Sequence, residues 1–347
     1  NWYPSAEYEC KNTIKNVGLF ELSPFSKYEI RGKKAYEELQ RLCTANIKNE
    51  IGKCTYTHML NEGAGIEADL TVVCIDKNYF RIISSAAVRT HDKAHIQKHL
   101  SKNIEFKDIT DDLICLGIFG PKSRYLLSQI TNEDLSNEYF KFGTGKNIKL
   151  GSTNAWIQRL SYVGELGYEI YVQNEHANKI YNLIIESGKK FKLSHCGAHA
   201  MDIMRMESGF LHWGHDISPE ENQYQAGLNF AISYKKPFNF IGKEKLLKIK
   251  NKKQDKRFVM LYLKNSKPGN PLLLHEEPIY LNNKIIGKTT SGNYSFNYNK
   301  NISFGYINSP LSNIELNELD LFIEIEKIKY QAKILLKPLK KRNFKCI

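Results

Sequence analysis

The stretch from Gly63 to Ala68, which reads Gly-Ala-Gly-Ile-Glu-Ala, matches the G-x-G-x-x-G/A pattern of loops that hold a dinucleotide pyrophosphate. Such a loop must run directly into a helix, because the helix N-terminus holds the phosphates. Here Ala68 is followed by Asp-Leu-Thr-Val-Val at 69–73, a run typical of a strand. This context excludes a nucleotide site, and the glycines are predicted to introduce a β-hairpin.

Asp69 is predicted to be the first residue of that strand, behind two glycines that would let a ligand approach the backbone closely. An aspartate in this place often only satisfies the backbone of its own turn. The functional alternative is a carboxylate that faces a ligand, and the residues around Asp69 leave both interpretations open.

Glu169 lies in the run Tyr168-Glu-Ile-Tyr-Val172. Strand alternation puts Tyr168, Ile170 and Val172 on one face, and Glu169 with Tyr171 on the other. The ordinary interpretation is a glutamate on a solvated strand face. The alternative is a carboxylate aimed at a ligand edge with two parallel N–H donors, for which its two oxygens are a good match.

Arg205 is surrounded in sequence by Met201, Ile203, Met204 and Met206, an apolar setting for an arginine. This setting indicates either a partly buried ion pair or a contact with an anion.

Three histidines, at 91, 95 and 99, recur every four residues and would share one helix face. No acidic ligand falls in that stripe and no H-E-x-x-H motif is present, so no metal site is predicted. The pairs His195/His199 and His212/His215 are interpreted as structural. No G-x-S-x-G elbow or Walker loop occurs in the sequence.

The elements that must position these residues follow from periodicity and turn signals. Helices are predicted at 33–43, around 90–100, at 174–189 and at 197–210. A hairpin is predicted to turn at 77–78, a strand to cover 113–119, and two strands to lie within 155–172. After about residue 235, strands with turn signals such as Asn282-Asn283 and Ser291-Gly292 predict a separate all-β domain behind a lysine-rich linker at 248–256.

The 347 residues, 41% of them hydrophobic, are enough for one large core or for two or three smaller ones. No apolar run is long enough for a membrane span and no signal peptide is visible. Seven scattered cysteines without C-x-x-C spacing indicate a reducing compartment, so we expect the cytoplasm or, in a eukaryote, the mitochondrial matrix. The net charge of +13 comes mostly from dispersed lysines without interleaved aromatic residues, so no nucleic-acid partner is expected.

A set of motifs covers essentially the whole chain in a fixed order. They are VGLFELSPFSKYEIRG (17–32), YTHMLNEGAGIEADLTV (56–72), GPKSRYLL (120–127), RLSYVGELGYEIYV (159–172), RMESGFLHWGHDI (205–217), PEENQYQAGL (219–228), FIGKEKL (240–246), TSGNYS (290–295) and FGYI (304–307). This ordered set resembles the aminomethyltransferase (glycine cleavage T-protein) family. It is most similar to the folate-binding C-terminal half of dimethylglycine and sarcosine dehydrogenases.

The resemblance implies an α+β fold of three domains in a clover-leaf around a funnel that holds tetrahydrofolate. The first, ferredoxin-like domain would comprise 1–28 plus 113–235, and the second would be inserted at 29–112. A β-barrel at 240–347 would complete the ring.

The resemblance also implies site residues. The folate-facing catalytic acid of the family falls on Asp69, the pterin-binding carboxylate on Glu169, and a ligand-contacting arginine on Arg205. Tyr56 matches a ligand-lining position. The chain departs from the family at Ala64, where a glycine is usual, at Glu21, where an aspartate is common, and at Met201. Glycine-cleavage members carry an arginine at that last position, so its loss weakens recognition of a lipoyl carrier more than folate binding.

The resemblance therefore implies a tetrahydrofolate-dependent one-carbon transferase. It would take carbon from dimethylglycine, sarcosine or glycine and form 5,10-methylenetetrahydrofolate. An FAD-dependent dehydrogenase domain or subunit is the implied partner, because this chain lacks a flavin-binding fingerprint. The alternatives are a folate-binding accessory protein without turnover and a folate-dependent demethylase of another methyl donor.

Overall fold

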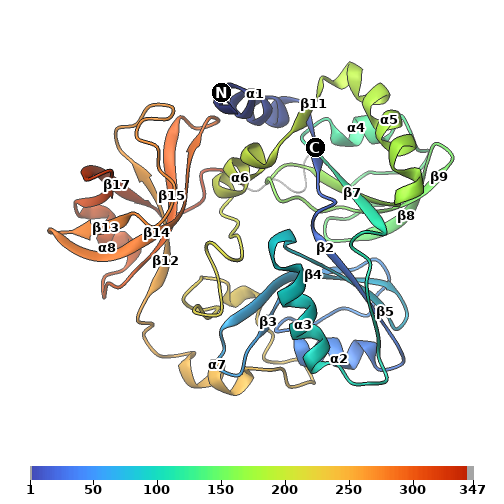
Figure 1. Cartoon of the computed structure of the whole chain (residues 1–347), viewed down its shortest axis with the longest axis horizontal. Helices are drawn as coiled ribbons and strands as arrows, with labels where there is room; N and C mark the ends of the chain where they lie inside the picture. Colours follow the sequence, from blue (N-terminus) through green and yellow to red (C-terminus); the bar gives the residue numbers. More distant parts are fainter. Residues whose placement is uncertain (1, 342–347) are drawn as a thin grey trace.

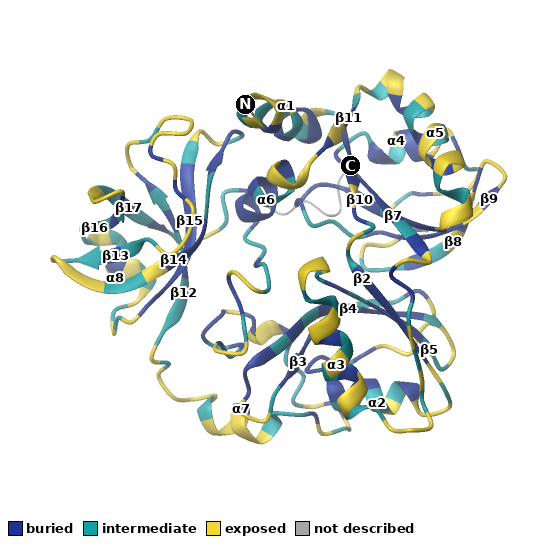
Figure 2. Cartoon of the chain, viewed as in Figure 1, coloured by how far each residue is buried: buried dark blue, intermediate teal, exposed yellow. Residues whose placement is uncertain are grey.

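The computed structural model describes residues 2–341, whose strands form two open sheets and a closed barrel arranged around a common centre (Figure 1). Cys346 and the other residues at 342–347, like residue 1, lie outside the described residues. No helix among residues 2–341 is long and apolar enough to cross a membrane. Most strand residues are buried, whereas exposed residues gather on loops and on the outer sides of helices such as α5 (Figure 2).

The first sheet has six strands in the order β11-β1-β7-β10-β9-β8, all antiparallel neighbours except β1 with β11. Its strands are β1 (Val17–Glu21), β7 (Leu113–Phe119), β8 (Gly145–Leu150), β9 (Thr153–Gln158), β10 (Gly167–Gln173) and β11 (Leu193–Cys196). Apolar residues cover one face beneath α4 (Ser123–Leu127) and α5 (Ala177–Gly188). The other face packs partly against α1 (Trp2–Lys15) and α6 (Ala198–Glu207), and it faces the centre of the molecule.

The second sheet has five antiparallel strands in the order β3-β4-β5-β2-β6. They are β2 (Ser26–Arg31), β3 (Cys54–Leu60), β4 (Ile66–Asp76), β5 (Tyr79–Ser84) and β6 (Glu105–Asp108). Leu39 of α2 (Ala35–Leu42) and Ile96 of α3 (Arg89–His99) pack on one face, against residues such as Val72 and Phe80. The opposite face of this sheet faces the centre of the molecule.

The barrel closes in the order β12-β15-β14-β13-β16-β17. Its strands are β12 (Arg257–Leu263), β13 (Pro278–Leu281), β14 (Lys284–Ser295), β15 (Lys300–Ile307), β16 (Leu321–Ile325) and β17 (Ile328–Leu335). Helix α7 (Lys243–Ile249) precedes it, and α8 (Asn313–Glu318) begins at a capping box of Ser312 and Glu315. The remaining short 3₁₀ turns are η1 (Ala86–Val88), η2 (Asn174–His176), η3 (Lys189–Phe191) and η4 (Asn229–Ala231).

The predicted α+β class with a C-terminal barrel is confirmed, and so are the hairpin at 77–78 and the strand at 113–119. Two local predictions were wrong. Ser291-Gly292 is not a turn but lies inside β14, where a Cβ on Gly292 would lie 2.6 Å from the carbonyl oxygen of Leu274. The glycine therefore permits a close approach of two chain segments rather than a turn.

Asp69 is not the first residue of its strand but the fourth, since β4 begins at Ile66. The two open sheets and the barrel each have a hydrophobic core, so we propose that the chain forms the three predicted domains. Strand β2 belongs to the second sheet, and the proposed first boundary therefore lies before Ser26 rather than after residue 28.

One buried ion pair joins α6 to the barrel. The Arg205 Nη1 atom lies 2.6 Å from Asp216 Oδ2, and both side chains are almost completely buried. Asp216 Oδ1 also accepts hydrogen bonds from the hydroxyls of Thr290 and Ser291 on β14, at 2.6 and 2.8 Å. The loop that carries Asp216 is thereby fixed between α6 and β14, and this junction positions the barrel against the first sheet.

We expect Asp216→Asn to destabilise the protein by on the order of 3 kcal/mol, because it leaves the Arg205 charge buried without its main partner. The matched control is Glu276→Gln, which removes an ion pair with Lys288 in which both side chains are more than half exposed. That pair should contribute about 1 kcal/mol or less. Denaturant unfolding of both variants measures the difference, and equal losses would contradict a special role for the buried pair.

Candidate functional site

The centre of the molecule holds a cavity of about 980 Å³, which we call the central cavity. Side chains from all three sheets line it, including Asp69 of the second sheet, Glu169 of the first sheet and Ser291 of the barrel. Its volume lies at the upper end of the range for pockets that enclose a drug-sized molecule.

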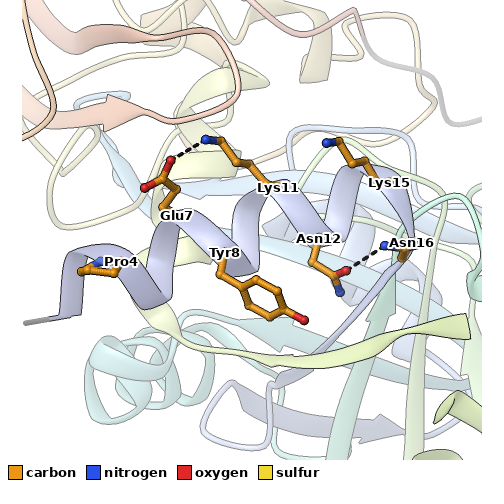
Figure 3. Close-up of a pocket in the computed structure, with 7 residues that line it drawn as sticks. All are labelled: Pro4, Glu7, Tyr8, Lys11, Asn12, Lys15 and Asn16. Atoms are coloured by element: carbon orange, nitrogen blue, oxygen red, sulfur yellow. Dashed lines mark hydrogen bonds and ion pairs between the residues drawn. The ribbon is translucent and has the colours of Figure 1, made fainter.

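A second hollow, of about 410 Å³, lies along the outer side of α1 (Figure 3). Its lining comes from that helix and the adjoining Asn16, and four of its polar groups already pair with each other: Lys11 with Glu7, and the Asn16 amide with Asn12 Oδ1 at 2.8 Å. It gathers no groups from other elements, so the central cavity is the better candidate site.

Asp69 projects from β4 directly opposite His58 of β3. Its Oδ1 atom is buried without a hydrogen-bond partner among the described residues, and it lies 3.5 Å from His58 Nε2. Burial raises the pKa of Asp69 to about 7, against a lowering hydrogen bond from Tyr56 and with a further rise from the charge of Asp92. This carboxyl can therefore take up or release a proton near neutral pH.

His58 is a neighbour of Asp69 that sequence reasoning missed. It is fully buried, and burial lowers its pKa to about 3, so the imidazole is neutral. Its Nδ1 accepts a hydrogen bond of 2.7 Å from the Gln223 amide, which places the ring proton on Nε2, where it is donated to the Tyr56 hydroxyl. The signal available in the sequence was the i, i+2 spacing of Tyr56 and His58, which puts both on one strand face.

Tyr56 lies beside these two residues, and its contact with a ligand stays a prediction. Its hydroxyl is 3.1 Å from His58 Nε2, and its ring lies nearly parallel to that of Phe230, with 6.1 Å between centroids. Both rings are substantially exposed and line the central cavity, so they offer an apolar edge next to Asp69.

Glu169 lines the central cavity from β10. The predicted alternation is confirmed: Tyr168, Ile170 and Val172 pack in the core beneath α5, whereas Tyr171 lies on the other face. The Tyr171 hydroxyl donates a hydrogen bond of 2.7 Å to Glu169 Oε2. Burial raises the pKa of Glu169 to about 7, although that hydrogen bond lowers it.

Arg205 also lines the cavity, but its guanidinium is largely occupied by the protein. It donates hydrogen bonds to Asp202, Asp216, the Phe210 carbonyl and the Ser291 hydroxyl, at 2.6 to 3.1 Å. This geometry agrees with the ion-pair interpretation. A contact between Arg205 and a ligand stays a prediction.

The glycines of the opening motif do not line the central cavity, so the interpretation that they make room for a ligand was wrong. A Cβ on Gly65 would lie 2.0 Å from the carbonyl oxygen of Pro219, which shows that this glycine lets two loops pack closely. The three histidines on α3 also have other contacts: His91 lies 3.2 Å from Glu67, and His95 packs on His99. Among residues 2–341, no group of three or more His, Cys, Asp or Glu side chains is arranged to hold a metal ion.

Comparisons with known proteins agree with this architecture. The domain family described as "GCVT N-terminal domain" matches residues 1–236, and "Glycine cleavage T-protein C-terminal barrel domain" matches residues 256–341. The crystal structure of glycine cleavage system aminomethyltransferase T from Bartonella henselae has the same fold, with a TM-score of 0.84 at 22% identity. The match covers 97% of this chain and 90% of that one.

Two relatives illustrate the range of similar proteins. Human mitochondrial dimethylglycine dehydrogenase is 34% identical over 347 residues, which cover 98% of this chain and 39% of that protein. The aminomethyltransferase of Caldanaerobacter subterraneus subsp. tengcongensis is 32% identical over 335 residues, which cover 96% of this chain and 87% of that protein. The chain spans only 35% to 39% of the length of the first curated relatives that it matches.

The two partly buried carboxyls should make the stability of the ligand-free protein depend on pH. The pKa values of Asp69 and Glu169 are both raised to about 7 in the folded state. The folded protein therefore binds these two protons more tightly than the unfolded chain does. Their contribution to stability is complete below about pH 4 and is lost as the pH rises toward about 7. The slope is at most about 1.4 kcal/mol per pH unit for each group.

Asp69→Asn and Glu169→Gln should therefore lose less stability than the parent protein between about pH 5 and about pH 8. Thermal unfolding at the two pH values measures this change. Glu138→Gln, at an exposed residue, is the control and should leave the pH dependence as it is. Identical pH profiles for all four proteins would show that neither carboxyl is held protonated by burial.

Proposed function

The chain belongs to the glycine cleavage T-protein (GCVT) family of aminomethyltransferases, as its motifs predicted, and from this we propose that it is a tetrahydrofolate-dependent one-carbon transferase. Its family includes enzymes, so the prediction of an enzyme family is confirmed. The proposed reaction takes up carbon from an N-methyl amino acid or glycine and forms 5,10-methylenetetrahydrofolate.

The observation that carries this proposal is the pair of raised-pKa carboxyls on two different sheets that line one cavity. Burying a carboxyl without full hydrogen bonding costs free energy, and that cost is offset when a ligand supplies donors. Asp69 Oδ1 has no hydrogen-bond partner among residues 2–341, so a polar ligand fits the site better than an apolar one.

Each side chain has a distinct role in this proposal. Glu169 would accept two parallel N–H groups from the pterin ring. Tyr56 and Phe230 would pack against an aromatic part of the ligand. Bound tetrahydrofolate would supply two amines that carry the one-carbon unit as a methylene bridge. Asp69 would hold a proton near neutral pH and exchange it with the ligand. The Tyr56 hydroxyl would orient the carboxyl, and the neutral imidazole of His58 would hold that hydroxyl.

The proposed carbon source is a separate dehydrogenase domain or subunit, which the sequence resemblance implies to be FAD-dependent. Two facts support it: the chain covers 39% of human dimethylglycine dehydrogenase, and almost all of this chain is included in the match. A dehydrogenase that oxidises an N-methyl group would deliver carbon at the oxidation level that a methylene bridge requires.

Tetrahydrofolate should raise the melting temperature, because a ligand that binds only the native state adds RT ln(1 + [L]/Kd) to stability. Glu169→Gln should weaken this binding by about 1.5–3 kcal/mol, the contribution of a hydrogen bond to a charged group. Thermal-shift titration and calorimetry measure both effects. No shift at ligand concentrations far above micromolar would refute the folate proposal, and an unchanged affinity in the variant would remove Glu169 from the site.

Asp69→Asn should lower turnover while leaving most of the binding, since the amide keeps the shape of the carboxyl but cannot act as a base. The expected loss is about 10²- to 10⁴-fold. Single-turnover formation of methylenetetrahydrofolate, corrected for the spontaneous condensation with formaldehyde, is compared with a binding isotherm. Binding without turnover in the parent protein would instead identify a folate-binding accessory protein.

A further inference from the structure

Gln158, the last residue of β9, is a buried amide that the protein itself leaves unsatisfied. Its side chain is completely buried, and neither Nε2 nor Oε1 has a hydrogen-bond partner among residues 2–341. Each such atom costs free energy, whereas an apolar side chain of the same size would cost none. Gln158 lines the central cavity, so a ligand there is the natural partner for its amide.

Gln158 is directly opposite Glu169 in the first sheet. Directly opposite residues of an antiparallel pair have Cβ atoms about 4.5–5.5 Å apart and point to the same face. The strands on either side place glycines in the same row, Gly145 opposite Gln158 and Gly117 opposite Glu169. The two polar side chains therefore stand together, with no side chain rising from the flanking positions.

The surroundings of this pair are apolar. The same face of the sheet carries Phe20, Leu22, Phe119 and Trp156, all buried in one hydrophobic cluster. A Cβ on Gly117 would lie 2.8 Å from Leu22 and Phe119 atoms, so these side chains lie over the glycine and form the wall. In such low-dielectric surroundings a hydrogen bond to a ligand discriminates strongly between matched and mismatched groups.

When Glu169 is ionised, its charge favours one orientation of the Gln158 amide. An amide N–H is attracted to a neighbouring carboxylate, whereas an amide carbonyl is repelled by it. The Nε2 side of Gln158 is therefore favoured next to Glu169. Read along the cavity wall, the pair offers two acceptor oxygens followed by an N–H donor.

We propose that Gln158 is a specificity-determining residue that donates to a ring oxo group lying next to the two N–H donors taken by Glu169. The complementary ligand edge is donor, donor, acceptor, which is the 2-amino-4-oxo edge of a pterin. This inference rests on the proposed function and names which chemical form of the pterin the site takes. A 4-amino ring carries an N–H donor at the third position. Either this donor faces the N–H of Gln158, or the amide rotates and its carbonyl lies next to the carboxylate of Glu169, which repels it.

The test compares tetrahydrofolate with 4-amino-4-deoxytetrahydrofolate, which differs from it at C4 and in the ring protonation that follows. Calorimetry gives the ratio of the two dissociation constants for the parent protein and for Gln158→Met, whose side chain is similar in length but has no amide. We expect the parent protein to bind tetrahydrofolate more tightly than the 4-amino analogue. We expect Gln158→Met to lower the ratio of the two dissociation constants by about tenfold, the contribution of one hydrogen bond. Gln173→Met, at the exposed end of β10, is the matched control and should change neither constant.

A second measurement needs no ligand. Because the amide is unsatisfied in the free protein, Gln158→Met should raise the melting temperature, by about 2–4 °C if it removes one such cost. A structural glutamine would show the opposite change. A preference ratio that is the same in the parent protein and in Gln158→Met, with tetrahydrofolate still bound, overturns this inference alone. Failure of both ligands to bind the parent protein overturns the proposed function and this inference together.

Discussion

The arrangement of the site depends on the buried ion pair between Arg205 and Asp216. A charge with so little exposure is tolerable only when its partner and the hydroxyls around it are held in place. Those hydroxyls belong to Thr290 and Ser291 of the barrel. The arginine belongs to α6, one of the helices that pack against the first sheet. The ion pair thus joins the barrel to the helix that packs against the first sheet, which also carries Glu169.

Several polar residues around the central cavity make the folded protein less stable than apolar residues at the same positions would. Gln158 is fully buried and Asp69 and Glu169 are partly buried, and the fold satisfies their hydrogen-bonding groups only in part. Each would be less costly as an apolar residue, yet all three lie where one ligand could reach them. Polar groups that the fold leaves partly unsatisfied and that converge on one cavity make it the candidate binding site. They lie here on strands of two sheets rather than on loops.

The two open sheets contribute different kinds of groups to the central cavity. The first contributes Glu169 and Gln158 from an apolar face, which suits recognition of a flat polar edge. The second contributes Asp69 with His58 and Tyr56, where a neutral imidazole and a phenol surround a carboxyl that titrates near neutral pH. Under the proposed function, this division would let binding and proton exchange be altered separately, because substitutions at residues without shared partners are usually additive.

Local patterns in the sequence were enough for the strand at 113–119, the hairpin at 77–78, the alternation around Glu169 and, through the ordered motifs, the family. The strand, the hairpin and the alternation follow from periodicity and turn chemistry, which act over a few residues, whereas the family rests on the resemblance of the ordered motifs. Only the tertiary structure decided the burial of His58, the pairing of Arg205 with Asp216, and the placement of Gln158 opposite Glu169. It also showed that Gly65 serves the packing of Pro219 rather than a ligand. Such facts depend on which distant segments meet and on how far water is excluded there, and desolvation of that kind is not encoded in the spacing of residues along the chain.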